Sequence, residues 1–185
     1  MENKKEKLED FKTAISSTVR SISNSEKIEV SFGNQTPKSE KNSIKLPELS
    51  QINNKLNFDQ IRAMADSKSL NFRFSDDKTF KEYEPVGNIS KRLYKISEKI
   101  RCEKIGTSYF KGVKNNIEKF YQERLSGMDL KSSEDKIIES FENYLRTKFL
   151  DFKSDSQIDK KLKSYKKGLN DKFKDKINQL NKDTL

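Results

Sequence analysis

Histidine is absent from this sequence of 185 residues, and cysteine occurs once. Histidine is the commonest general base and the commonest metal ligand of proteins, so both roles would fall to other side chains. A zinc site with neither histidine nor paired thiols would be built largely from carboxylates, which is uncommon. The lone Cys102 excludes a disulfide within the chain. We therefore expect no catalytic, cofactor or metal site in this chain alone, and we interpret the adjacent acids Asp76 and Asp77 as solvated caps in a polar turn.

Several sequence motifs are also missing. The six glycines form no GxxxxGK[ST] phosphate loop, no GxGxxG turn and no GxSxG elbow. No segment approaches the roughly 18 consecutive apolar residues of a transmembrane helix. The opening MENKKEKLEDFK lacks the apolar region of a secretory signal. These absences predict a cytoplasmic protein that does not span a membrane.

Charge is abundant where apolar residues are few. The sequence is 37% charged and 31% hydrophobic, with 39 basic and 29 acidic residues and a formal net charge of +10. Lysines are spread along the chain among acidic residues, which is typical of solvated surfaces that can meet an acidic protein partner. The alternative is a basic helical module that binds nucleic acid, or an anionic membrane, through a stretch such as KKLKSYKKGLNDKFKDK at 160–176. Acidic residues interrupt that stretch, so we expect no nucleic acid and no membrane as partner.

The hydrophobic periodicity predicts a mainly α fold with one small β-hairpin. Apolar residues recur at helical spacing over 3–23, 56–74, 89–125, 134–150 and 156–181. The period changes to two at 27–32 and 43–47, on either side of a polar loop. The segment 89–125 would be one long central helix with the others packed around it.

The long predicted helix carries polar residues where its apolar stripe should continue. Glu103 and Gly106 occupy stripe positions, and a second face of the same helix includes Glu98 and Arg101. A glycine in a helix costs roughly 1 kcal/mol relative to alanine, which is tolerable where another chain segment approaches closely. We predict a structural or partner-contact polar cluster and two close-packing glycines. The cluster is Arg62, Asp66, Glu98, Arg101 and Glu103, and the glycines are Gly106 and Gly112.

Several stretches resemble the N-terminal region of CobT, a subunit family of aerobic cobaltochelatase. The family's opening helix is similar to FKTAISSTVRSIS at 11–23, and its hairpin is similar to IEVSF and IKLPEL. Its RGxADxxALRLxxHDxxxHxxxxP stretch resembles RAMADSKSLNFRFSDDKTFKEYEP at 62–85, and a later segment is similar to YLRTKF at 144–149. The most specific likeness is that of EQARVEAIGxxxMxGVxxNLxxxxxxR to SEKIRCEKIGTSYFKGVKNNIEKFYQER at 97–124. Identity and spacing are kept there at Glu98, Arg101, Glu103, Ile105, Gly106, Gly112, Val113 and Asn116.

This sequence departs from the family pattern in several places. Ser75 and Phe80 stand where the pattern has histidines, and Ala63 stands where it has glycine. The family continues through an acidic linker into a von Willebrand A-type domain with a DxSxS motif, which this sequence lacks. The resemblance implies a helical N-terminal domain over 1–127, with the hairpin at 27–47, and a helical extension over 128–185. We expect either a truncated member or an N-terminal fragment.

The family's activity implies a role for the chain. It would be a non-catalytic, partner-binding subunit of the ATP-dependent cobaltochelatase that inserts cobalt(II) into hydrogenobyrinic acid a,c-diamide in cobalamin biosynthesis. The implied partners are a CobS-type AAA+ ATPase and a CobN-type large subunit, in a ring-forming hetero-oligomer. The complex would use ATP, Mg²⁺ and Co²⁺.

A further likeness concerns proteins in which a hairpin, an HExxH helix and a later ExxR helix precede a von Willebrand A domain. On that likeness Ser67, Lys68 and Asn71 replace the ligands of the HExxH helix, and Glu98 is a former ligand held by Arg101 or Arg62. The fold would then be a degenerate zincin-like scaffold without its metal.

Overall fold

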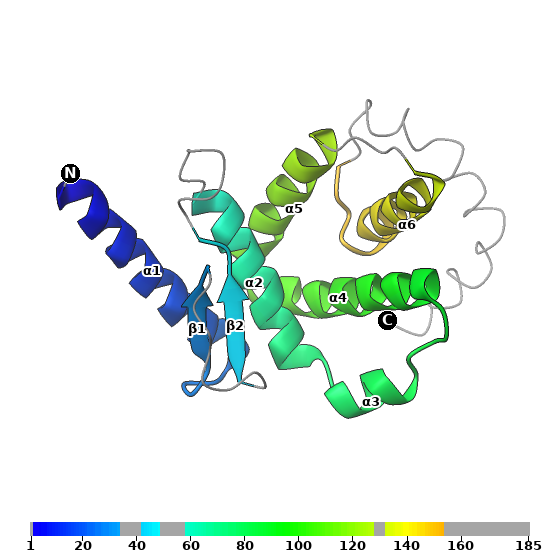
Figure 1. The fold of residues 1–185 in the computed structure, drawn as a ribbon, viewed down its shortest axis with the longest axis horizontal. Coiled ribbons are helices and arrows are strands. Elements are labelled where there is room, and N and C mark those ends of the chain that lie inside the picture. The colour runs from blue at the N-terminus through cyan, green and yellow to red at the C-terminus, as the bar shows by residue number, and fades with distance from the viewer. Residues whose placement is uncertain (1, 34–41, 49–57, 128–131, 154–185) are drawn as a thin grey trace. The chain divides into compact units, whose positions relative to one another are not determined.

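The computed structural model describes residues 2–33, 42–48, 58–127 and 132–153. Its helices are α1 (Glu2–Ser23), α2 (Phe58–Phe74), α3 (Asp77–Glu82), α4 (Asn88–Tyr109), α5 (Lys111–Ser126) and α6 (Ser133–Phe149), and its strands are β1 (Glu29–Phe32) and β2 (Ser43–Leu46) (Figure 1). The mainly α class with one small β element is confirmed. The helix predicted over 156–181 lies outside the described residues.

The chain forms two compact units that alternate along the sequence. Unit 1 contains Met1–Glu82 and Arg101–Tyr121, and unit 2 contains Tyr83–Ile100 and Gln122–Leu185. The boundary at 127 and the extension over 128–185 stay predictions.

Unit 1 is built around a core shared by α1, α2 and the two strands. Each element contributes apolar residues at its own period, 3.6 for the helices and two for the strands. Figure 1 shows the strands beside α1 and α2. The buried members of this core are Ile15, Val19, Ile28, Phe32, Ile44, Leu46, Ile61 and Ala65.

The two strands pair in parallel, so the predicted hairpin is wrong in its direction. Glu29 lies opposite Ser43 and Phe32 lies opposite Leu46, and the amide of Gly33 donates to the carbonyl of Leu46. Alternation identifies which side chains face the core, but it is the same when a strand is read in either direction. The sequence pattern therefore predicted the strands and their buried faces without fixing how they pair.

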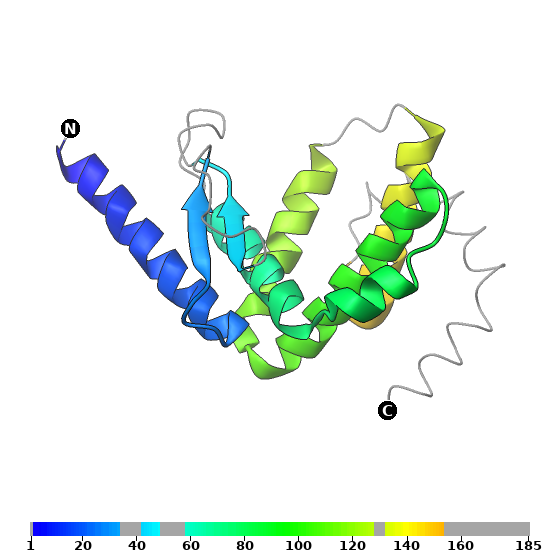
Figure 2. The same ribbon diagram turned by 60° about the horizontal axis from the view of Figure 1, so that its bottom comes forward.

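The long helix predicted over 89–125 is two helices. The first, α4, ends at Tyr109, and α5 begins at Lys111 after a break at Phe110. The Phe110 amide still donates to the Gly106 carbonyl, while the Val113 amide turns to the Phe110 carbonyl. Figure 2 shows the change of direction at this junction. Apolar spacing continues through the break because each helix buries apolar residues of its own, such as Ile100 in α4 and Ile117 in α5.

Unit 2 contains α6, which begins as the sequence predicts. The Ser132 side chain accepts a hydrogen bond from the Asp135 amide at 3.0 Å, satisfying one of the unpaired donors at the helix start. Glu134 and Asp135 place negative charge in the first turn, where the helix dipole favours it. Buried apolar residues of this unit include Leu125, Ile138, Leu145, Leu150 and Phe152.

The short helix α3 was not predicted; Asp76 and Asp77 were interpreted as solvated caps in a polar turn, and Asp77 is the first residue of the helix. The Asp76 carboxylate accepts hydrogen bonds from the amides of Lys78 and Thr79 and from the Thr79 hydroxyl. The bond from the Thr79 side chain is the main reason why the pKa of Asp76 lies below its ordinary value.

Among the helices that the structure describes, none combines the length and apolar character needed to cross a bilayer.

Candidate functional site

The two stretches that resemble the family most closely meet inside unit 1. The Ser67 hydroxyl on α2 donates to Glu103 Oε1 on α4 at 2.6 Å, and Glu103 has no exposed surface. A buried carboxylate is costly unless it is hydrogen-bonded, so this contact satisfies Glu103 and ties α4 to α2. Glu103 thus lies on the buried stripe, where the spacing put it.

A second contact, which is partly buried, joins α2 to α5. The Asn116 amide donates to Asp66 Oδ2 at 2.8 Å. Burial raises the pKa of Asp66, against the opposing effects of the Asn116 hydrogen bond and the Arg62 charge. We call Asp66, Ser67, Glu103 and Asn116 the buried polar cluster. Asp66, Ser67 and Glu103 are buried and Asn116 is half-buried. These four residues tie α2 to α4 and α5, so they are better suited to positioning helices than to reaching a substrate.

Gly106 on α4 packs directly against Leu70 on α2. A Cβ built on Gly106 would lie 2.1 Å from Leu70 Cδ2 and 2.8 Å from Leu70 Cγ. Leu70 is fully buried, so glycine is required for this approach. Gly112 differs, because no described atom beyond its chain neighbours and the nearby backbone of α5 lies within 4 Å of a Cβ there, so packing gives no reason for a glycine.

The remaining residues of the predicted cluster are placed differently. Arg62 and Arg101 are exposed, and Glu98 is half-buried. Arg101 Nη2 donates to the Phe74 carbonyl at 2.6 Å, at the end of α2. The structure therefore buries both Asp66 and Glu103, each hydrogen-bonded to its own partner on another helix. Those partners, Asn116 and Ser67, were omitted from our cluster prediction.

The zincin-like likeness stays a hypothesis. Of the residues that replace the HExxH ligands, Ser67 binds Glu103, and Lys68 Nζ donates to the Lys45 carbonyl at 2.5 Å. Across the described ranges, no three or more histidine, cysteine, aspartate or glutamate side chains lie grouped to hold a metal ion.

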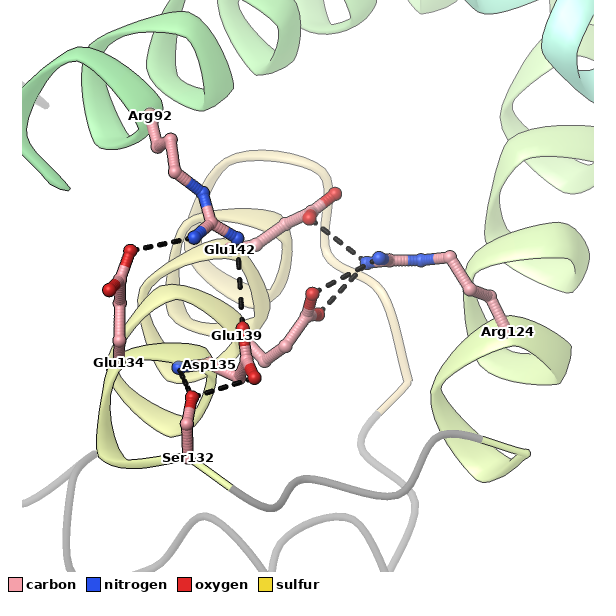
Figure 3. A network of polar contacts seen from close by, with 7 residues as sticks. All are labelled: Arg92, Arg124, Ser132, Glu134, Asp135, Glu139 and Glu142. Carbon is pink, nitrogen blue, oxygen red and sulfur yellow. Dashed lines mark hydrogen bonds and ion pairs between the residues drawn. The ribbon is translucent and has the colours of Figure 1, made fainter. Parts of the chain in front are cut away.

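Unit 2 contains a charge network that the sequence did not reveal (Figure 3). Arg124 on α5 donates to both oxygens of Glu139, at 3.1 and 2.9 Å, and to Glu142 at 3.0 Å. Arg92 on α4 lies 2.7 Å from Glu134 and 3.8 Å from Asp135. Arginines from two helices thus bind the acidic face of α6.

The innermost pair of this network is Glu142 and Arg146. Arg146 Nε donates to Glu142 Oε1 at 2.9 Å, and its guanidinium lies over the Phe152 ring at 5.6 Å. Burial alone would raise the pKa of Glu142, but Arg146, Lys99 and Arg124 together hold it below its ordinary value. Burial raises the pKa of Glu139; the Arg124 charge lowers it, and the neighbouring Glu142 charge raises it again. The i, i+4 spacing of Glu142 and Arg146 was the available signal, but such pairs are common on exposed helix faces.

The Asp66 environment gives a pH prediction. An aspartate whose folded pKa is raised loses stabilising energy as pH rises from about 4 through that folded pKa. Asp66→Asn should therefore gain stability relative to wild type between about pH 3.5 and 7, measured by urea unfolding. Asp59→Asn is the matched control, because the Lys119 hydrogen bond lowers the pKa of the exposed Asp59. Its relative stability should change in the opposite direction, and parallel curves for the two variants would contradict the assignment.

Comparison with known proteins gives one family. The family model described as cobalamin biosynthesis protein CobT matches residues 5–183, nearly the whole chain. No solved structure matches the chain. The match includes both sides of the buried polar cluster.

Proposed function

Because this chain belongs to the CobT family of cobalamin biosynthesis proteins, we propose that it is a non-catalytic, partner-binding part of the ATP-dependent cobaltochelatase. The complex would insert cobalt(II), its substrate, into hydrogenobyrinic acid a,c-diamide and would use ATP and Mg²⁺. The proposed partners are a CobS-type AAA+ ATPase and a CobN-type large subunit.

The observation that carries this proposal is the inward direction of the polar residues in the family-like stretches. Glu103, Ser67 and Asp66 are buried, and their bonds run between helices of the same unit. A carboxylate enclosed in this way cannot exchange protons with a bound substrate without opening the unit. The cluster therefore supports a scaffold whose outer surfaces bind partners.

Binding to the ATPase is the direct test. We expect the purified chain to form a complex with the CobS-type ATPase of the same organism, seen by analytical ultracentrifugation in the presence of Mg²⁺ and ATP. Glu103→Gln, at a buried position, should lower the free energy of unfolding and leave the affinity of the folded protein unchanged. If the ATPase binds neither this chain nor a longer version of it, the proposal fails.

We also predict that the chain binds neither zinc nor cobalt stoichiometrically. Its sequence has no histidine and one thiol, which leaves only oxygen-rich sites that transition metals bind weakly. Elemental analysis after dialysis should find well under one equivalent of either metal. About one equivalent that survives dialysis would overturn the prediction.

A further inference from the structure

Arg73, at the end of α2, is held in place by aromatic rings. Its guanidinium carbon lies 5.3 Å from the centroid of Phe74 and 5.7 Å from that of Phe110, and its Nη1 donates to the Ile22 carbonyl at 3.1 Å. All of these residues belong to unit 1. The side chain is thus an exposed cation with little freedom to lose on binding.

The charge of Arg73 is not neutralised within the described part of the chain. No described carboxylate oxygen lies within 4.0 Å of its guanidinium, whereas Arg92, Arg124 and Arg146 each pair with glutamate. A guanidinium presents five donors in a planar fork that fits a carboxylate. Arg73 uses one nitrogen for the Ile22 carbonyl, and the other nitrogens of this exposed guanidinium are available to a ligand.

An exposed aromatic ring stacks on Phe74, one of the rings that hold this cation. Tyr109 is 70% exposed, and its ring stacks on Phe74 with centroids 6.1 Å apart and an interplanar angle of 18°. Tyrosine and arginine are the side chains that most often dominate the energy of protein interfaces, particularly where packing has already fixed them.

We propose that Arg73, Phe74, Tyr109 and Phe110, which we call the arginine–aromatic corner, bind an acidic segment of a protein partner. A glutamate or aspartate of the partner pairs with Arg73, and a neighbouring apolar or aromatic side chain packs on Tyr109. The inference rests on the proposed function, because it takes the ATPase subunit as the protein that carries this segment.

Single-stranded nucleic acid is the rival occupant, and the geometry favours it less. Sequence-tolerant strand binding requires several aromatic faces open to successive bases along a basic groove. At this corner Arg73 lies over the rings of Phe74 and Phe110, so Tyr109 is the aromatic most open to a ligand. A single exposed ring, without further open aromatic faces, fits one peptide side chain with a carboxylate neighbour better than a run of stacked bases.

Two probes and two matched controls test the corner. The probes are the purified CobS-type ATPase and a random glutamate–tyrosine copolymer, titrated by fluorescence anisotropy at low salt. The variants are Tyr109→Ala and Arg73→Gln, and circular dichroism checks that each is folded. If Arg73→Gln unfolds because it loses the hydrogen bond to Ile22, Tyr109→Ala still tests the corner. Tyr83→Ala removes a ring that is 66% exposed in unit 2, and Arg20→Gln removes an equal charge from α1.

We expect Tyr109→Ala and Arg73→Gln each to weaken binding of both probes at least about tenfold, and the controls to change it less than about threefold. If wild type and Tyr109→Ala bind both probes with equal affinity, the arginine–aromatic corner is not the binding site, while the proposed subunit role still stands. Copolymer binding that depends on Arg73 and Tyr109, without any ATPase binding, would support the corner and defeat the subunit role. A thymidine oligonucleotide that binds more tightly than the copolymer, and with the same dependence, would overturn the proposal in favour of nucleic acid.

Discussion

Arg146→Met is expected to lower the free energy of unfolding by about 3–5 kcal/mol, because it leaves the buried Glu142 without its closest cation. The Arg146 and Glu142 side chains are only 2% and 7% exposed. Arg124 also reaches Glu142, but it is shared with Glu139. Urea unfolding at neutral pH, followed by circular dichroism, measures the loss.

Arg92→Met is the matched control for that experiment. Arg92 also binds an acid on α6, but it is 49% exposed, and exposed pairs contribute about 0–1 kcal/mol. The double variant Arg146→Met with Glu142→Leu removes both buried charges and should recover much of the stability. If Arg146→Met lowers the free energy of unfolding no more than Arg92→Met does, the Arg146–Glu142 pair contributes no more than an exposed ion pair.

Gly106→Ala is expected to destabilise the protein by about 1–3 kcal/mol, although alanine is the better helix former. The new Cβ would overlap three atoms of Leu70, including Cγ, so rotation of the end of the side chain does not relieve the contact. Leu70 is enclosed by unit 1, and its displacement would disturb the packing of α2 against α4. Thermal and urea unfolding of the variant would measure the loss.

Gly112→Ala tests the cause of that loss. With open space around its Cβ, this change should be neutral or stabilise the protein by up to about 1 kcal/mol. Leu70→Ala alone should cost about 2–5 kcal/mol, and combining it with Gly106→Ala should cost less than the sum of the two. Strict additivity would mean that Gly106 and Leu70 do not compete for the same space.

Local pattern predicted most of the helices because each has one face buried. The spacing of Ile15, Val19 and Ile22 in α1, or of Ile138 and Leu145 in α6, reports a nearby core whatever its partner is. The same reasoning placed Glu103 on a buried stripe, and the structure buries it completely. Burial of a single position was therefore readable from the sequence.

The partners of buried groups were less readable, because they come from distant parts of the chain. Ser67 and Glu103 are 36 residues apart, and Asp66 and Asn116 are 50 apart. Periodicity carries no information on which of two buried faces will meet. The parallel direction of the strands and the break at Phe110 escaped prediction for a related reason, since neither changes the order of polar and apolar residues.

The alternation of the two units has a consequence for synthesis on the ribosome. Unit 1 needs Arg101–Tyr121 as well as Met1–Glu82, so its first part is made before the segment that completes it. At about 5–20 residues per second, the interval lasts a few seconds. During that time the face of α2 that carries Leu70 and Asp66 is not yet covered by α4 and α5. The nascent chain would then expose this unfinished surface to chaperones, and a fragment that stops at Glu82 would keep it exposed permanently.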